Sequence, residues 1–140
     1  MVAQNSVLVD TSAWVDFFRG VRPVSSRVRE LISQERAAFC GVTLYELLQG
    51  IRSAGEGDRL RVVLESLPHI AADRDVWARA GNLSHTLRKS GVTLPMSDVV
   101  IAAAALTNDL EVLTTDDHFE HIEGLKLYRP LCSENRPASR

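Results

Sequence analysis

The chain has 140 residues, of which 45% are hydrophobic, and a formal net charge of −2. This composition suits one globular domain and excludes a disordered chain. The charge is not the strongly basic balance of a protein that coats nucleic acid. The longest wholly apolar run, residues 99–106, is far shorter than the roughly 20 residues that cross a bilayer. Cys40 and Cys132 have no metal-binding spacing and no signal-peptide pattern precedes Arg19, so we expect a cytoplasmic protein without a membrane partner.

The first predicted element is a short buried strand at residues 7–9, which is followed at once by an acid and a helix. β-Branched valines suit a pleated surface, whereas Thr11 and Ser12 are typical of a helix start. Asp10 therefore lies at the carboxyl end of a strand, which is the edge where ligands bind in parallel α/β sheets. An acid that merely caps the helix also suits this position, and the sequence leaves both interpretations open.

Strands and helices then alternate along the chain. After a helix that opens at Ser25 or Ser26, further strands are predicted at residues 37–40, 69–71, 111–114 and 125–128. Further helices are predicted at residues 42–52, from Asp58 to Pro68, at 73–89 and around 99–106, with a loop at 53–57. The alternation predicts a single α/β domain with a mainly parallel sheet, and residues 133–140 read as a loose polar tail.

Two helices have informative faces. In the helix at residues 73–89, helical spacing predicts an inner face that contains Val76, Trp77, Ala80, Leu83 and Leu87. The alanine-rich helix around residues 99–106 is apolar on nearly all sides, so we expect it to be central and buried. Either Thr93 or Ser97 suits the position of its cap.

Four acids occupy comparable places in this arrangement. Asp116 follows the strand at residues 111–114, and Asp98 lies at the start of the apolar helix. Glu46 lies within the helix at residues 42–52, on the side away from its leucines. Each of these acids also has an ordinary explanation, because Asp98 complements a helix dipole, Glu46 suits a solvated helix face and Asp116 suits a turn.

If the four acids converge, their negative charges require a balancing positive charge. Two carboxylates ~4 Å apart repel by about 4 kcal/mol at an effective dielectric constant of ~20, and some would protonate if nothing balanced them. No lysine lies near these acids in the sequence, whereas a divalent cation would relieve the repulsion. Oxygen ligands favour Mg²⁺ or Mn²⁺ over Zn²⁺, and a carboxylate site with metal ions suits in-line displacement at phosphate.

The stretches that carry the acids, residues 10–14, 43–50, 97–103 and 113–119, resemble the four acidic motifs of PIN-domain nucleases. They are most similar to those of VapC-type toxins from bacterial toxin–antitoxin pairs. The resemblance implies a three-layer PIN-like domain over residues 1–132, with a central, mainly parallel sheet of four to five short strands flanked by helices. It also implies a magnesium-dependent endoribonuclease that leaves a 5′-phosphate and a 3′-hydroxyl, a homodimer and a cognate VapB-type antitoxin.

By this resemblance, Asp10, Glu46, Asp98 and Asp116 match the catalytic acids of the family. The resemblance implies that Asp10, Asp98 and Asp116 are the metal ligands, directly or through water, with Mg²⁺ as the cofactor and Mn²⁺ as a substitute. Glu46 would complete the cluster and orient the attacking water.

Other residues match supporting positions or depart from the pattern. Ser12 and Thr114 match polar positions that support the family's site. Many relatives carry a further acid where His118 stands, so the number of metal ions and a substitute role for Asp117 stay open. His118 and His121 lack cysteine partners, which argues against a zinc site.

Three rival classes fit the sequence less well. A metal-dependent adhesion module needs a hydroxyl where Trp14 stands, and a haloacid-type hydrolase needs an acid at Ser12. A receiver-type signalling domain needs paired early acids and a late lysine near a strand end, and neither is evident in the sequence. The remaining alternatives are a PIN-like nuclease outside a toxin–antitoxin pair and a catalytically inactive PIN-like RNA-binding domain. No residue marks which RNA is the substrate.

Overall fold

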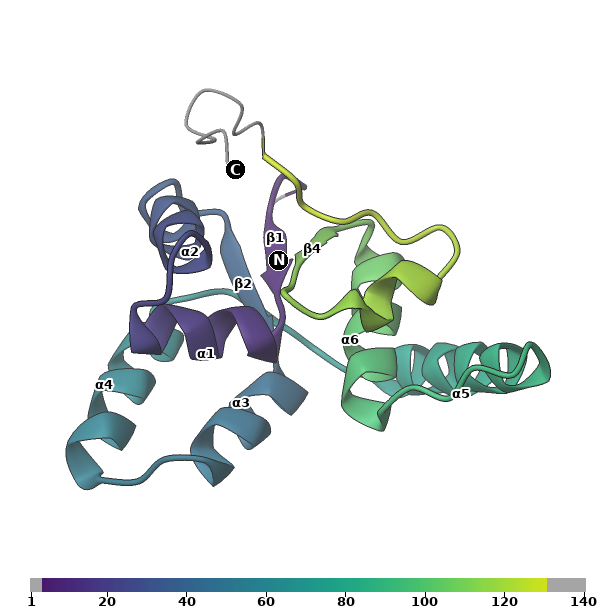
Figure 1. Cartoon of the computed structure of the whole chain (residues 1–140), viewed down its shortest axis with the longest axis horizontal. Coiled ribbons are helices and arrows are strands. Elements are labelled where there is room, and N and C mark those ends of the chain that lie inside the picture. The colour runs from purple at the N-terminus through teal and green to yellow at the C-terminus, as the bar shows by residue number, and fades with distance from the viewer. Residues whose placement is uncertain (1–3, 131–140) are drawn as a thin grey trace, which may run out of the picture.

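The computed structural model describes residues 4–130, so the predicted tail at residues 133–140 lies outside the described residues. The centre of the domain is a parallel sheet with the strand order β3-β2-β1-β4 (Figure 1). The strands are β1 (Val7–Val9), β2 (Ala37–Cys40), β3 (His69–Ile70) and β4 (Glu111–Leu113). Because β1 pairs with both β2 and β4, the chain leaves the middle of the sheet at Asp10.

The strand predicted at residues 125–128 is reduced to a single parallel bridge. Leu127 bridges Val112 of β4, and the N–H of Tyr128 donates to the carbonyl of Val112 at 2.8 Å. Four strands and this bridge agree with the predicted sheet of four to five short, mainly parallel strands.

Helices cover both faces of the sheet, which gives the predicted three layers (Figure 1). Leu8 of β1 faces a core that contains residues of α5 (Arg74–Lys89) and α6 (Met96–Asn108). Val7 and Val9 face the opposite core, because successive strand residues point to opposite faces. That second core is formed with α1 (Thr11–Arg19), α2 (Val24–Ser33), α3 (Gly41–Gln49) and α4 (Ala54–Glu65).

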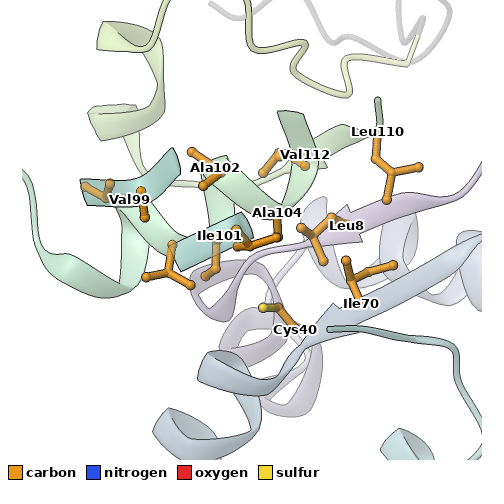
Figure 2. Close-up of a cluster of buried hydrophobic side chains, with 14 of the residues drawn as sticks. Leu8, Cys40, Ile70, Val99, Ile101, Ala102, Ala104, Leu110 and Val112 are labelled. Atoms are coloured by element: carbon orange, nitrogen blue, oxygen red, sulfur yellow. The ribbon is translucent and has the colours of Figure 1, made fainter. Parts of the chain in front are cut away.

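The central helix is α6, as its apolar sequence predicts. Residues 99–105 are each at most 3% exposed, and they pack on Leu8 and Val112 of the sheet (Figure 2). Alanine side chains let the helix axis approach the strands closely. The first turn of α6, which carries Asp98, therefore lies close to the residues that follow β1 and β4.

The predicted loop at residues 53–57 is wrong, because α4 begins at Ala54 rather than at Asp58. The Ser53 hydroxyl accepts a hydrogen bond from the Glu56 N–H, and the Glu56 carboxylate accepts one from the Arg52 N–H. This reciprocal capping resembles a capping box, and the serine and glutamate three residues apart were its signal. Gly57 lies inside the helix and is buried, with Ile51 packed over it.

The inward position predicted for Trp77 is also wrong, since the Trp77 side chain is 46% exposed. The helix α5 packs mainly against α6, so its buried strip is narrow and contains Val76, Ala80 and Leu87. Spacing alone assigned the tryptophan to this strip, although the neighbour that would cover it is absent from the described part of the chain.

Three helix boundaries differ from the predictions by a few residues. The helix α2 begins at Val24 after Pro23, before either predicted serine, and α3 ends at Gln49. Pro95 takes the cap position of α6 in place of Thr93 or Ser97. Among the described residues, no helix has the length and apolar character needed to cross a membrane.

Candidate active site

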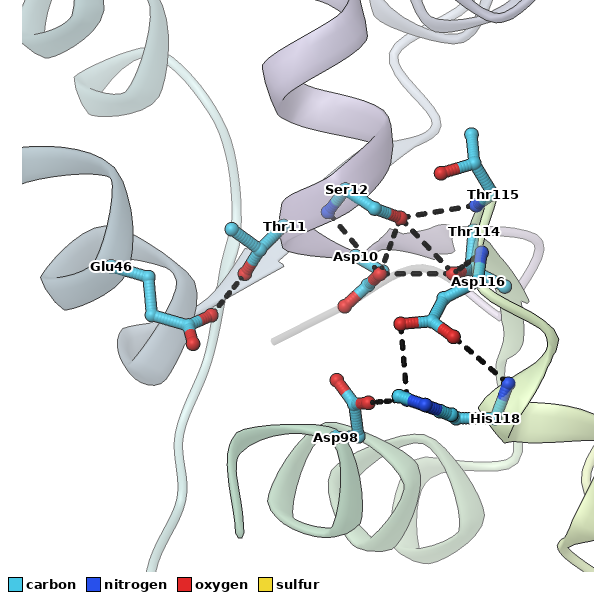
Figure 3. A network of polar contacts seen from close by, with 9 residues as sticks. All are labelled: Asp10, Thr11, Ser12, Glu46, Asp98, Thr114, Thr115, Asp116 and His118. Carbon is cyan, nitrogen blue, oxygen red and sulfur yellow. Dashed lines mark hydrogen bonds and ion pairs between the residues drawn. The ribbon is translucent and has the colours of Figure 1, made fainter. Parts of the chain in front are cut away.

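Asp10 begins the site at the carboxyl end of β1. Its Oδ2 atom accepts hydrogen bonds from the Ser12 N–H at 3.2 Å, the Ser12 hydroxyl at 2.7 Å and the Thr114 hydroxyl at 2.9 Å (Figure 3). Asp10 is therefore the cap of α1, and this confirmed capping role is compatible with the prediction that Asp10 also belongs to a functional site. Ser12 and Thr114, the predicted supporting residues, are the side chains that fix its orientation.

The second oxygen of Asp10 has no such partners. Asp10 is 2% exposed, and its Oδ1 is buried without a hydrogen bond from any described residue. Burial raises the pKa of the Asp10 carboxyl, and the hydrogen bonds from Ser12 and Thr114 offset this only in part. The structure therefore holds a buried carboxylate oxygen that lacks the donor or cation that buried oxygens normally contact.

Asp98 and Asp116 approach the site from two other elements. Asp98 comes from the first turn of α6, and Asp116 follows β4 as the cap of the 3₁₀ helix η1 (Asp117–His121). His118 lies between them, with its Nδ1 2.7 Å from Oδ2 of Asp98 and 3.1 Å from Oδ2 of Asp116. Figure 3 shows the carboxylates of Asp10, Asp98 and Asp116 facing a common space.

The charges in this space perturb one another. Burial is the main cause of the raised pKa of Asp98; the neighbouring Asp10 and Asp116 raise it further, while the hydrogen bond with His118 lowers it. The hydrogen bond with Asp98 in turn raises the pKa of His118 above its ordinary value. Within residues 4–130, no lysine or arginine side chain forms an ion pair with these acids.

Glu46 faces the same edge from α3 and is hydrogen-bonded to Thr11, the residue that follows Asp10. The Thr11 hydroxyl donates to Oε1 of Glu46 at 2.7 Å and lies 3.1 Å from the hydroxyl of buried Thr43. Thr11 directly follows Asp10, so this contact joins the start of α1 to α3. The structure thus brings all four predicted acids to one edge of the sheet, with Glu46 at its margin.

Asp98, Asp116 and His118 meet the geometric requirement for holding a cation, and we call them the three-ligand group. Each offers one ligand atom, and these atoms all lie within 4.8 Å of one another. Acidic groups without an ion are common, but the buried, unpartnered Oδ1 of Asp10 adds an independent reason to expect a cation here. The residues present therefore fit a divalent cation bound mainly by carboxylates.

Sequence reasoning missed three side chains of the site. It noted His118 only as a departure from a family pattern and as an improbable zinc ligand. It interpreted Thr11 only as a helix-starting residue and assigned no role in the site to Thr43. The available signals were weak, because His118 lies two residues after Asp116 and Thr43 lies one helical turn before Glu46. His121, by contrast, is exposed and outside the three-ligand group.

A family model for the PIN domain matches residues 7–125, and the chain therefore belongs to the PIN-domain family. Its sequence is 31% identical over 121 residues to the VapC ribonuclease Mb1587 of Mycobacterium bovis, which covers 83% of this chain and 90% of that relative. It is 26% identical over 128 residues to ribonuclease VapC1 of Methanocaldococcus jannaschii, covering 89% of this chain and 88% of the relative. The relatives thus agree with the predicted resemblance to VapC proteins.

Solved structures share the fold. The DNA-bound VapBC structure from Salmonella typhimurium superposes with a TM-score of 0.75 and 24% identity over 89% of this chain and 97% of that chain. A toxin–antitoxin complex from Klebsiella pneumoniae gives a TM-score of 0.72 and 25% identity over 86% and 95% of the two chains. The match spans nearly the whole length of these neighbours, which supports the three-layer arrangement described above.

Proposed function

We propose that this chain is a divalent-cation-dependent endoribonuclease, and that it is the toxin of a type II toxin–antitoxin pair in the cytoplasm. The observation that carries the proposal is the convergence of Asp10, Glu46, Asp98 and Asp116 at one edge of the sheet, where Oδ1 of Asp10 is buried and unpartnered. Membership of the PIN-domain family and relatives named VapC ribonucleases support RNA as the substrate.

The cofactor in this proposal is Mg²⁺, for which Mn²⁺ substitutes. Asp10, Asp98 and Asp116 would hold it, directly or through water. A divalent cation at such a site stabilises charge on the phosphate oxygens and makes a bound water more acidic. Ser12 and Thr114 keep Oδ2 of Asp10 fixed, so that the free oxygen faces the other acids.

Glu46 serves as the residue that orients the attacking water. The hydrogen bond from Thr11 restrains Oε1, so the other carboxylate oxygen of Glu46 is the one available to accept a proton from water. In this proposal the phosphodiester would lie between Glu46, at the margin of the acid cluster, and the three aspartates.

RNA cleavage by purified protein, freed of any bound partner, tests this function. We expect cleavage with Mg²⁺ or Mn²⁺, no cleavage in EDTA, and a loss of at least about 100-fold for Asp98→Asn. Asp109→Asn is the matched control, because Asp109 lies at the other end of α6 in an exposed pair with Lys126. Cleavage that persists in EDTA, or full activity of Asp98→Asn, would contradict the mechanism.

The cleavage assay tests the first alternative function, and co-expression with a neighbouring partner tests the second. A catalytically inactive PIN-like domain would bind RNA without cutting it under any metal condition. A PIN-like nuclease outside a toxin–antitoxin pair would cut RNA but would not be restrained by a partner encoded beside it.

The partners in this proposal are a cognate VapB-type antitoxin and a second copy of the chain. A surface pocket beside Glu46 is the candidate binding site for the antitoxin. It combines apolar side chains of α1, α3 and α4 with the charged side chains of Arg19 and Arg52. Co-expression with the neighbouring small reading frame should yield a stable complex that does not cleave RNA, and sedimentation of the chain alone should give a dimer. Failure to recover any partner would favour the stand-alone nuclease.

A further inference from the structure

One of the three ligand atoms that the three-ligand group offers is a nitrogen. Asp98 and Asp116 offer oxygen atoms, whereas His118 offers Nδ1, and the three atoms lie within 4.8 Å of one another. The backbone sets this arrangement, because Oδ1 of Asp116 accepts a hydrogen bond from the N–H of His118 at 3.0 Å. That turn leaves Oδ2 of Asp116 and Nδ1 of His118 side by side, with Oδ2 of Asp98 opposite.

The separations suit adjacent ligands of one ion. Bonds of about 2.1 Å at right angles place neighbouring ligand atoms about 3 Å apart. Nδ1 of His118 lies 2.7 Å from Oδ2 of Asp98 and 3.1 Å from Oδ2 of Asp116. Oδ1 of Asp10, buried without a partner, supplies the independent sign that this space receives a cation.

A nitrogen ligand changes which ion the site favours. Mg²⁺ is a hard ion that takes oxygen ligands and binds imidazole poorly, whereas first-row transition ions accept imidazole together with carboxylates. An all-oxygen site discriminates only weakly between Mg²⁺ and Mn²⁺, and one imidazole adds a preference for Mn²⁺.

We propose that Nδ1 of His118 is a metal ligand alongside Asp98 and Asp116, and that it makes the site prefer Mn²⁺ over Mg²⁺. This inference rests on the proposed function and deepens it by assigning a ligand and an ion preference to the same site. Either ion supports cleavage, but Mn²⁺ binds the site more tightly than Mg²⁺. His118 is the residue that sets the preference, and Asp98 and Asp116 set the requirement for a divalent ion.

A purely structural role for His118 makes the opposite prediction. In that case its ring serves only as a hydrogen-bonded partner that balances the two acids in place of an ion. Replacing His118 by an acid would then tighten the binding of Mn²⁺ and Mg²⁺ alike, and no nitrogen would coordinate the bound metal.

The test is direct measurement of metal binding by the purified chain at mildly alkaline pH. Mn²⁺ titration followed by electron paramagnetic resonance gives its affinity, competition gives that of Mg²⁺, and pulsed resonance of bound Mn²⁺ detects coupling to a ligand nitrogen. The variants are His118→Asp, its matched control His121→Asp on the same 3₁₀ helix, and Asp98→Asn.

For the wild type we expect Mn²⁺ to bind at least about tenfold more tightly than Mg²⁺, with nitrogen coupling present. His118→Asp should remove the coupling and bring the two affinities to within about threefold, while His121→Asp keeps both properties of the wild type. Mn²⁺ bound without nitrogen coupling in the wild type, or an unchanged ratio of Mn²⁺ to Mg²⁺ affinity in His118→Asp, would overturn the assignment of His118. Unchanged binding by Asp98→Asn would instead overturn the carboxylate site itself, so the two failures are distinguishable.

Discussion

At the scale of single residues, the two oxygens of the Asp10 carboxylate have different surroundings and different proposed roles. Oδ2 caps α1 and is bound by Ser12 and Thr114, whereas Oδ1 is buried without a partner. A buried charge of this kind reduces the stability of the metal-free protein, because ionisation requires the carboxylate to lose its hydration.

Asp10→Asn should therefore stabilise the metal-free protein while abolishing cleavage. Asparagine retains an acceptor for the helix cap and replaces the unpartnered oxygen by an amide donor that faces Asp98 and Asp116. We expect a gain of about 1 kcal/mol, which raises the melting temperature by about 4 °C for a chain of this size. Thermal unfolding in EDTA measures the change.

The stability difference between the wild type and Asp10→Asn should depend on pH. Because burial raises the pKa of Asp10, its protonated form stabilises the fold below its ordinary pKa of 3.8, and this contribution is lost as the pH rises through the folded-state pKa. The advantage of asparagine should grow from pH 4 to pH 7. Asp73→Asn, at the exposed cap of α5, is the control and should change stability little at either pH. A destabilised Asp10→Asn protein at pH 7 would contradict this account.

Thr11→Val tests the link between α1 and Glu46. Valine has nearly the same shape but cannot donate to Oε1 of Glu46, so the carboxylate should lose its fixed orientation. We expect cleavage to slow by about tenfold, the lower end of the effects of supporting residues in catalytic sites, with an unchanged melting temperature. Thr115→Val, on the exposed turn beyond β4, provides the same substitution as a control and should cleave normally.

Asp10, Asp98 and Asp116 could be predicted from the sequence because each lies at a recognisable strand end or helix start, and parallel strands bring such ends together. Glu46 lies within α3, so only the resemblance to a family motif indicated it. His118 and Thr11 could not be assigned in the same way. Their roles depend on side-chain directions set by the turn at Asp116 and by the approach of α3, which no periodicity reports.

At the scale of elements, α6 positions the site through its small side chains. Alanines on the helix let it approach β1 closely, and any larger residue there must displace either the helix or the sheet. The position of Asp98 therefore depends on residues that lie well away from the acids.

Ala104→Leu should both destabilise the fold and weaken cation binding. Ala104 is fully buried against the sheet, so three added carbon atoms overpack the core at a cost of about 1–3 kcal/mol. Urea unfolding measures this cost. Mn²⁺ titration measures the loss of affinity that we expect when Asp98 is displaced. Ala78→Leu on the exposed side of α5 is the control and should affect neither property. Full cation affinity in a destabilised Ala104→Leu protein would show that α6 moves without carrying Asp98.

Long apolar stretches of sequence correctly predicted the buried strands and the helix α6. The exact ends of the helices depend on local capping hydrogen bonds, which such stretches do not indicate. The buried strands and α6 follow from hydrophobic runs, so they could be predicted. The start of α4 depends on hydrogen bonds of Ser53 and Glu56, and the exposure of Trp77 depends on which neighbours α5 has. Spacing along one helix contains no information about its neighbours.

At the scale of the whole molecule, the proposed cation site links segments that are far apart in sequence. Asp10, Asp98 and Asp116 come from three such segments, and a bound divalent ion would relieve the repulsion between their carboxylates. Folding and ion binding should therefore stabilise each other, since the unfolded chain does not hold the acids together.

Saturating Mn²⁺ should raise the melting temperature of the wild type. At a free concentration about 100 times the dissociation constant, the added stability is about 2.7 kcal/mol. Differential scanning fluorimetry with and without EDTA measures the shift, which should be nearly absent in Asp98→Asn and retained in Asp109→Asn. An equal shift in Asp98→Asn would indicate that the ion binds elsewhere.

The 3₁₀ helix η1 carries His118 of the three-ligand group directly beside a buried anchor residue. Phe119 is 1% exposed and anchors this turn in the core, so the backbone at position 118 stays in place whichever side chain it carries. Histidine and aspartate codons differ at a single nucleotide, and the exchange would touch no buried packing. Under the proposal made for His118, a single nucleotide change would therefore alter the ion preference of the site and leave intact the interior on which the positions of the other acids depend.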